Sequence, residues 1–401
     1  RLRNPYTGEI PGGINSRQLK FAKTLPTIES FRLLHPEKLH KSAVYGWKSR
    51  GPYNVGGRTK GVAYDIRDEN ILLAGAATGG MWKSVDNGNT WKKTTNQSDL
   101  HSVTCLIQDT RPGKEDTWYY GTGEYIGTGG EKTKIMGNSP LGGDGIFKST
   151  DNGDTWSLLD FTSTGRPDQY DQRFDYIWNL AVDQTNLIED EVYSAAYGSI
   201  FRSIDGGNSW ESVLGGASTV GYSDVAVTSE GIVYATLCWG TSRGIWRSED
   251  GVNWTSISPP NWPEYTRRTV IGIAPSNEDV VYFLSDLSTT WTEQEHKFWK
   301  YTYLSGDGSD AGGIWEDRSD NIPDNFNSQL SFCLVNKVYP DNEDIVFIGG
   351  VRLYRSTNGL STKSYSTITG SQMEPYNHCD QHSVIFSKND SKLHIYLMTG
   401  E

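Results

Sequence analysis

The chain has 401 residues, of which 35% are hydrophobic and 21% charged, and this composition is typical of a soluble globular protein rather than a disordered one. No apolar run approaches the roughly 18 residues that a membrane-spanning helix needs, which excludes a bilayer-embedded chain. The 37 basic and 49 acidic residues give a net charge of −12, which would repel phosphate backbones and argues against a nucleic-acid partner.

Residues 1–42 carry no repeat. They contain Pro26 and Pro36 and show only weak helical periodicity between Leu19 and Leu25. We therefore expect an extended arm with one or two short helices. The chain starts at Arg1 without a signal peptide, so its location has to be argued indirectly.

From residue 43 onward the sequence repeats one unit. Four copies of a motif are GGMWKSVDNGNTW, GDGIFKSTDNGDTW, GSIFRSIDGGNSW and RGIWRSEDGVNW. Their aligned serines, Ser84, Ser149, Ser203 and Ser248, lie 65, 54 and 45 residues apart, so loops of variable length join a constant module. A decayed fifth copy carries Ser356 but lacks the tryptophan.

Two alternating apolar stretches precede each motif and predict four strands in every unit. The units begin near Thr59, Val103, Ile177, Ser223, Val270, Leu330 and Ser383. Such repetition predicts an all-β fold, a β-propeller of about seven four-stranded blades that spans residues 43–401. A β-sandwich would not explain why the same turn recurs at the same place in each unit.

The seventh unit is unfinished at Glu401. We expect a strand at 43–50, with Trp47, to close the ring, and we expect the parent chain to continue past Glu401. These two segments would supply the outer strands of the seventh blade.

The repeated motif reads S-x-D-x-G-x-T-W and resembles the Asp-box or BNR repeat. The resemblance implies a structural role: the Asp accepts hydrogen bonds from turn N–H groups, the Gly takes a positive φ and the Trp packs into the blade. The residues concerned are Ser84, Asp86, Gly88, Trp91, Ser149, Asp151, Gly153, Trp156, Ser203, Asp205, Gly207, Trp210, Ser248, Asp250 and Trp254.

The same box occurs in sialidases, xyloglucanase-like hydrolases, sortilin-type receptors and photosystem assembly factors, so the fold does not name the function. The segments WKSRGPYNVGGRTKGVAYD, AATGGMWKS and YNHCDQHSVIF are similar to those of large surface propeller proteins of Bacteroidetes. That resemblance implies export by a type IX system to the medium or the outer cell surface.

Two enzyme families of this fold can be compared motif by motif. The resemblance to sialidases implies an Arg-Ile-Pro opening motif, and this chain lacks it. The resemblance also implies a cluster of arginines that binds the substrate carboxylate. Four arginines could reach one face: Arg58, Arg173, Arg267 and Arg268. Xyloglucanase-like hydrolases place an Asp directly before a Gly-Gly in the first blade, where this chain has Thr78. The departure removes one of the two carboxylates that glycoside hydrolysis usually needs.

The loops between second and third strands, together with the connections between units, are expected to form the functional face. The candidate catalytic carboxylates there are Glu124, Asp144, Asp175 and Asp224. The candidate ligand-binding side chains are Tyr125, Arg173, Tyr176, Tyr222, Trp239 and Trp291. Aromatic rings interleaved with carboxylates suit a sugar or peptide surface, and ordinary loop packing is the competing interpretation.

Three further residues could bind a metal ion. His378, Asp380 and His382 alternate, so a strand would place them on one face. Successive side chains on that face stand about 6.6 Å apart, which would strain a single site, and a hydrogen-bonded strand start is the alternative. No cofactor motif is present.

The four cysteines Cys105, Cys238, Cys333 and Cys379 lie far apart and are expected to be isolated thiols, with a Cys105–Cys333 bridge as the alternative. The sequence thus favours a secreted or cell-surface module that binds or adheres to a glycan or protein partner without catalysis. A further expectation is that the module belongs to a larger surface or secretion assembly. The alternative is a glycoside hydrolase acting on an extracellular polysaccharide, and a third reading is a passive spacer.

Overall fold

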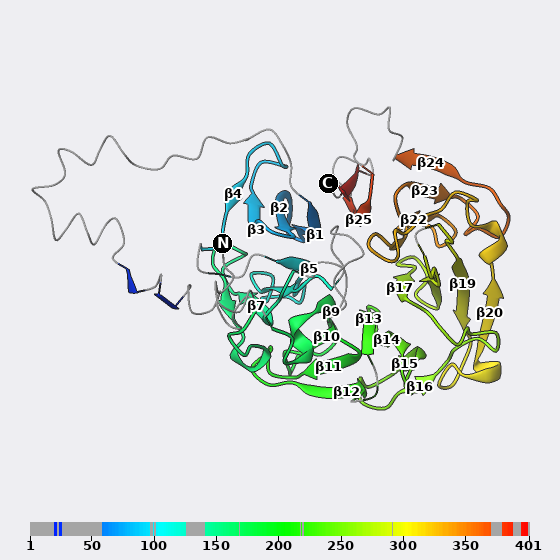
Figure 1. The fold of residues 1–401 in the computed structure, drawn as a ribbon, viewed down its shortest axis with the longest axis horizontal. Coiled ribbons are helices and arrows are strands. Elements are labelled where there is room, and N and C mark those ends of the chain that lie inside the picture. Colours follow the sequence, from blue (N-terminus) through cyan, green and yellow to red (C-terminus); the bar gives the residue numbers. More distant parts are fainter. Residues whose placement is uncertain are drawn as a thin grey trace, which may run out of the picture.

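The computed structural model describes residues 20–21, 24–25, 58–96, 99, 102–125, 141–167, 169–216, 218, 220–290, 292–369, 379–387 and 394–399. Over these ranges the chain forms antiparallel sheets that stand around a centre like the blades of a wheel (Figure 1). The predicted all-β propeller with four-stranded blades is confirmed.

Six sheets have four strands each, paired in chain order. They are β1 Thr59–Asp65, β2 Asp68–Ala76, β3 Gly80–Ser84 and β4 Lys92–Lys93; β5 Val103–Gln108, β6 Trp118–Thr122, β7 Ile146–Ser149 and β8 Ser157–Leu158; β9 Ile177–Val182, β10 Val192–Ala196, β11 Ser199–Ser203 and β12 Glu211–Gly215; β13 Val220–Val227, β14 Val233–Trp239, β15 Gly244–Ser248 and β16 Thr255–Ser256; β17 Arg268–Ile273, β18 Val280–Asp286, β19 His296–Tyr303 and β20 Gly313–Asp317; β21 Val335–Val338, β22 Val346–Gly349, β23 Leu353–Ser356 and β24 Ser366–Thr369.

The predicted count of about seven four-stranded blades is wrong, because the described residues form six. A seventh sheet has only two strands, β25 (Gln381–Ser387) and β26 (His394–Thr399). The proposed closing strand at 43–50 lies outside the described residues, as does almost all of the arm at 1–42.

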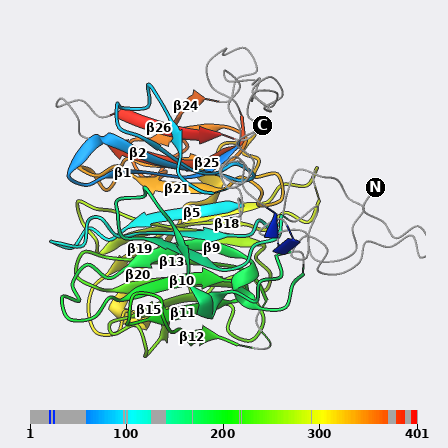
Figure 2. The same cartoon turned by 90° about the vertical axis from the view of Figure 1, so that its left-hand side faces the viewer.

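The first strand of every sheet faces the axis of the wheel. Strands β1, β5, β9, β13, β17, β21 and β25 each contact the next, and β25 contacts both β21 and β1. The two-stranded sheet therefore occupies the gap between the first and sixth blades and closes the ring. Figure 2 shows these strands stacked one above another when the wheel is turned edge on.

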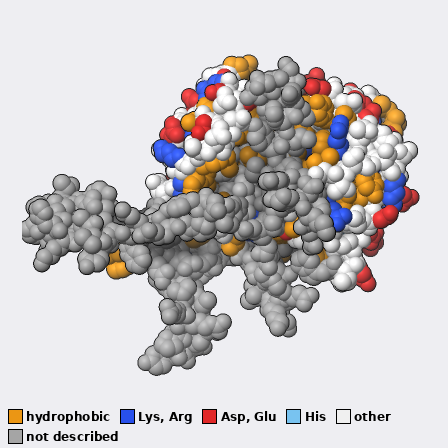
Figure 3. Space-filling model, turned by 90° about the horizontal axis from the view of Figure 1, so that it is seen from above, with side chains coloured by type: hydrophobic (Ala, Val, Ile, Leu, Met, Phe, Trp, Pro, Cys, Tyr) orange, Lys and Arg blue, Asp and Glu red, His pale blue; other side chains and the backbone are white. Residues whose placement is uncertain are grey.

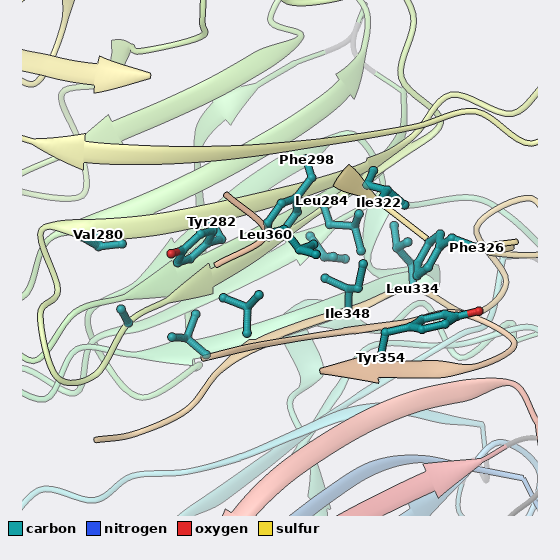
Figure 4. Close-up of a cluster of buried hydrophobic side chains, with 14 residues drawn as sticks. Val280, Tyr282, Leu284, Phe298, Ile322, Phe326, Leu334, Ile348, Tyr354 and Leu360 are labelled. Carbon is teal, nitrogen blue, oxygen red and sulfur yellow. The ribbon is translucent and has the colours of Figure 1, made fainter. Parts of the chain in front are cut away.

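Apolar side chains fill the space between neighbouring sheets. Between the fifth and sixth blades, one buried cluster includes Tyr282, Leu284, Phe298 and Ile348 (Figure 4). Blades also approach closely by backbone: a Cβ on Gly121 would lie 2.6 Å from a methyl group of Ile177, so only glycine fits there.

The repeated turns join the third and fourth strands of a blade. In the third blade Ser203 Oγ donates to Asp205 Oδ1 (2.8 Å) and accepts the Gly207 N–H (2.8 Å), and the same Asp205 oxygen accepts the Ser209 N–H (2.9 Å). These hydrogen bonds stabilise the carboxylate and lower the pKa of Asp205, although burial opposes the shift. The tryptophans differ, since Trp210 is buried whereas Trp91 is 40% exposed.

Because the strands are antiparallel, the repeated turns lie at one end of the blades, and the connections between second and third strands lie at the other end. We call the latter end the loop face.

No helix among the described residues has the length and apolarity to cross a membrane. The edge seen in Figure 3 mixes acidic, basic and apolar side chains.

Candidate functional site

The axis of the wheel contains a channel of about 660 Å³ lined by the first strands. At its loop-face end, Glu124 follows β6 and is buried. Its carboxylate pairs with Arg58 and, at 2.6 Å, with Lys60 Nζ. This end of the channel therefore contains a buried ion-pair network rather than an isolated carboxylate.

Phe332 is the shared neighbour of this network. The Lys60 Nζ lies 4.8 Å and the Arg58 guanidinium carbon 5.2 Å from its ring centre, and the ring of His382 meets it edge to face at 4.9 Å. We call Arg58, Lys60, Glu124, Phe332 and His382 the mouth cluster. Burial and the neighbouring cations hold the pKa of His382 well below its usual value, so the imidazole is neutral at pH 7.

An unusual backbone segment positions Phe332. Gln329, Leu330 and Ser331 have φ values of 51°, 55° and 70°, a left-handed run that non-glycine residues rarely adopt. The sequence predicted a strand from about Leu330, whereas β21 begins at Val335. The prediction was wrong because the apolar run belongs to a turn under the channel mouth.

A second group of rings lies beside the mouth cluster. Tyr125 packs against Tyr176 (5.4 Å between ring centres), Tyr197 (5.5 Å) and Tyr222 (5.9 Å), and Trp178 joins the same cluster at 6.2 Å from Tyr125. The structure thus brings together three of the predicted ligand-binding side chains, Tyr125, Tyr176 and Tyr222. Tyr176 and Tyr222 are buried, and both pack against Tyr125.

Two predicted carboxylates interact on the loop face, and the first of them, Asp175, lies on the connection between the second and third blades. Asp175 ends the short helix η3 (Arg173–Asp175), and its Oδ2 accepts the N–H groups of Asp171 (2.8 Å) and Gln172 (2.9 Å). Its Oδ1 is buried and has no hydrogen-bond partner among the described residues. Burial, with repulsion from Asp171 and Asp144, raises the pKa of Asp175 to about 7.

Asp144 is the second member of this group. It lies between β6 and β7 and is buried, and its Oδ1 accepts the Thr164 N–H at 2.8 Å. Burial raises its pKa, and Asp171 adds repulsion. Asp144, Asp171 and Asp175 form what we call the carboxyl cluster. A cluster of this kind can keep one carboxyl protonated beside an ionised one, which is the condition for general acid and base chemistry.

The fourth candidate carboxylate, Asp224, lies inside the channel wall. Its Oδ1 accepts hydrogen bonds from Asn179 Nδ2 (2.8 Å) and the Val225 N–H (2.9 Å), and its Oδ2 accepts the Ile271 N–H (2.9 Å). These partners belong to three successive blades, so Asp224 ties inner strands together.

The remaining predicted residues are dispersed. Arg173 donates to the carbonyl oxygens of Tyr197 and Gly216. Trp239 is 59% exposed, and its ring lies 5.8 Å from that of Tyr265. Trp291 lies outside the described residues.

The predicted metal site lies only partly within the described residues. His378 lies outside the described residues. Asp380 accepts a hydrogen bond from Gln329 Nε2 (2.8 Å), whereas His382 belongs to the mouth cluster. In the described part of the chain, no three His, Cys, Asp or Glu side chains are placed to hold a metal ion.

Sequence reasoning missed Lys60, Phe332 and Asp171. A lysine at the start of an inner strand and a phenylalanine in an apolar run carry no signal of their own. Asp171 stands four residues before Asp175 in a polar connection, and this spacing was the available clue.

No family model matches the chain. Among curated proteins it is 25% identical over 290 residues to the xyloglucanase Xgh74A of Acetivibrio thermocellus, which covers 64% of the chain and 32% of that protein. It is 26% identical over 243 residues to a xyloglucanase of Hypocrea jecorina, covering 54% of the chain and 28% of that protein. The chain thus spans about a third of the length of these relatives.

Solved structures share the fold. An ancestral GH74 enzyme superposes with a TM-score of 0.61 at 18% identity, covering 89% of this chain and 45% of the other. The Niastella koreensis GH74 enzyme gives 0.52 at 18% identity, covering 78% and 45%. The curated relatives contradict the predicted binding or adhesion module without catalysis, because the relatives named are hydrolases, and they favour the alternative of a glycoside hydrolase.

Proposed function

We propose that this protein is a glycoside hydrolase that acts on an extracellular β-glucan of the xyloglucan type. The observation that carries the proposal is the carboxyl cluster, in which Asp175 has a pKa raised to about 7. A carboxylic acid that is still protonated near neutral pH can protonate the oxygen of a leaving sugar. The xyloglucanase relatives supply the substrate class.

In this proposal Asp175 is the general acid and Asp144 the partner carboxylate. The two belong to adjoining connections on the loop face, and repulsion from Asp144 contributes to the raised pKa of Asp175. Thr78, which stands where xyloglucanase-like hydrolases have an Asp, has no titratable group, so proton transfer must use other residues of this chain. Tyr170, which stacks on Tyr176 and is partly exposed, would contact the sugar.

The test measures reducing ends released from xyloglucan by the purified chain between pH 4 and 9. We expect Asp175→Asn and Asp144→Asn each to lower kcat by on the order of 10²-fold or more, the range for loss of a general acid or base. The rate should fall above about pH 7 as Asp175 ionises. Asp279→Asn, an exposed carboxylate in the turn between β17 and β18, is the matched control.

Absence of turnover on xyloglucan and other β-glucans, or variants as active as the parent, would overturn the assignment. Retention of turnover in Asp144→Asn alone would leave Asp175 as acid and move the partner role to Glu124.

We also propose that the protein is exported to the medium or the outer cell surface, where polysaccharide is accessible, and that the repeated turns are Asp-boxes. The hydrogen bonds of Ser203 and Asp205 support the second statement. Cell fractionation and protease accessibility on intact cells test the first, and protection from added protease would refute it.

A further inference from the structure

Two aliphatic side chains project from the end of the wheel opposite the loop face. Leu187 and Ile188, in the connection between β9 and β10, are 76% and 96% exposed. This connection joins the first and second strands of the third blade, so it lies at the same end as the repeated turns. We call these two residues the knob. Adjacent aliphatic side chains that water surrounds are stabilised when another apolar surface covers them.

The connection that carries the knob is held in one conformation. The buried guanidinium of Arg111, from the second blade, donates to the carbonyl oxygens of Asn186 (2.6 Å) and Glu189 (2.7 Å), one on each side of the knob. The Asn186 Oδ1 also accepts the N–H groups of Ile188 (3.2 Å) and Glu189 (3.0 Å). The knob is therefore preorganised, so its burial in an interface would lose little conformational entropy.

The central channel opens at the same end of the wheel. Ile66, in the turn between β1 and β2, and Pro275, which follows β17, both line the channel and are exposed. Other apolar side chains at this entrance are partly exposed and lie at or just after the ends of first strands: Tyr64, Ile107, Val227, Ile273 and Pro340. We call this apolar entrance the socket. The channel volume of about 660 Å³ exceeds that of two aliphatic side chains.

The charges around the knob and in the channel have opposite signs. The connection at 183–191 contains no basic residue and four acidic ones, Asp183, Glu189, Asp190 and Glu191. Among the described residues, three cations and one anion line the channel: Lys60, Arg268, Lys337 and Asp224. Opposite charges favour the approach of the knob to the channel. The same acidic residues argue against an anionic lipid surface as the partner of the knob.

A knob and a socket at one end of the same chain can satisfy each other in a pair of identical molecules. A two-fold axis that lies in the interface, midway between knob and socket, exchanges the two positions, so each knob meets the socket of the other copy. We propose that two copies of this chain pair through the ends that carry the repeated turns, each inserting Leu187 and Ile188 into the channel entrance of the other. The pair forms at the end opposite the loop face, so it does not depend on the proposed hydrolysis.

The test is sedimentation equilibrium of the full chain over a range of concentrations, in which we expect a monomer–dimer equilibrium. Ile188→Asp should weaken dimerisation on the order of 10²-fold, because losing one buried isoleucine contributes about tenfold and two-fold symmetry counts the substitution twice. Ile66→Lys, in the socket, should also weaken it. Ile314→Asp, which changes an exposed isoleucine of the outer strand β20, is the matched control and should leave dimerisation unchanged.

The double variant with Ile188→Asp and Ile66→Lys is the sharper test. The new carboxylate of each knob would meet the new cation of the other copy's socket, so this variant should dimerise more tightly than Ile188→Asp alone, whereas damage to the fold would accumulate. Thermal unfolding checks the fold of each variant. A parent that stays monomeric, an effect of Ile188→Asp without one of Ile66→Lys, or a double variant no tighter than Ile188→Asp would refute the pairing. A monomeric parent that sediments with phosphatidylcholine vesicles would refute it too, and would assign the knob to a lipid surface.

Discussion

Replacing Asp175 by asparagine should raise the stability of the folded protein while it lowers the hydrolytic activity. The pKa of Asp175 is raised from 3.8 to about 7, so the folded protein binds more protons than the unfolded chain between these pH values. Stability therefore falls as pH rises from about 4 through about 7, and the full penalty applies above that window. Asp175→Asn removes the ionisation and should be more stable than the parent at pH 8.

The magnitude follows from the shift. One pKa unit corresponds to about 1.4 kcal/mol, so a shift from 3.8 to about 7 sets an upper bound of about 4 kcal/mol. Part of the shift is repulsion that Asp175 shares with Asp144 and Asp171, so we expect about half of this bound, roughly 2 kcal/mol. Asparagine fits the site, because its oxygen can accept the two N–H groups that Oδ2 now accepts.

The assay is urea unfolding of the parent, Asp175→Asn and the control Asp279→Asn between pH 4.5 and 8.5. The free energy of unfolding of Asp175→Asn should exceed that of the parent increasingly as pH rises, whereas the control should follow the parent throughout. Curves for parent and Asp175→Asn that stay parallel across the range would refute the raised pKa, and with it the reason for assigning Asp175 as the acid.

Three further outcomes are expected. Ser203→Ala should lower the free energy of unfolding by about 1–3 kcal/mol, because a buried turn N–H loses its acceptor; urea unfolding measures the change, and no loss would contradict the structural role of the turn. Gly251→Ala should destabilise far more than Gly165→Ala in the same assay: the two glycines share φ values of 70° and 68°, but only at Gly251 would the new Cβ lie 1.7 Å from the Tyr193 hydroxyl. Among the four thiols, that of Cys379 should react first with a thiol reagent, because the other three are buried; simultaneous labelling of all four would argue against this packing.

The fold was predictable because its strongest local signal is repeated. Ser, Asp and Gly at fixed spacing describe a turn whose hydrogen bonds are all local, so each copy could be interpreted alone. The unit near Val270 lacks the motif, yet its alternating pattern still forms β17–β20. The number of blades could not be predicted, because a complete seventh blade depends on which distant segment supplies its outer strands.

The candidate site was predictable only in part. We expected the loops between second and third strands, and the connections between units, to form one face. Glu124, Asp144 and Asp175 do lie at that end of the wheel. This expectation did not distinguish Asp224, whose oxygens are occupied by neighbouring inner strands. Nor could it find the mouth cluster, since Lys60 and His382 come from β1 and β25, near opposite ends of the chain, and meet only when the ring closes.

The aspartates at the two ends of the wheel have opposite electrostatic environments. At the repeated turns, N–H and hydroxyl donors lower the pKa values of Asp86, Asp151 and Asp205, so their charge contributes to stability. On the loop face, burial raises the pKa values of Asp144 and Asp175, and holding them there costs stability. A buried position lowers the stability contributed by a carboxyl group that has only a structural role. A general acid that must keep its proton near pH 7 needs the raised pKa that such a position gives. The contrast therefore favours chemistry on the loop face and scaffolding at the opposite end.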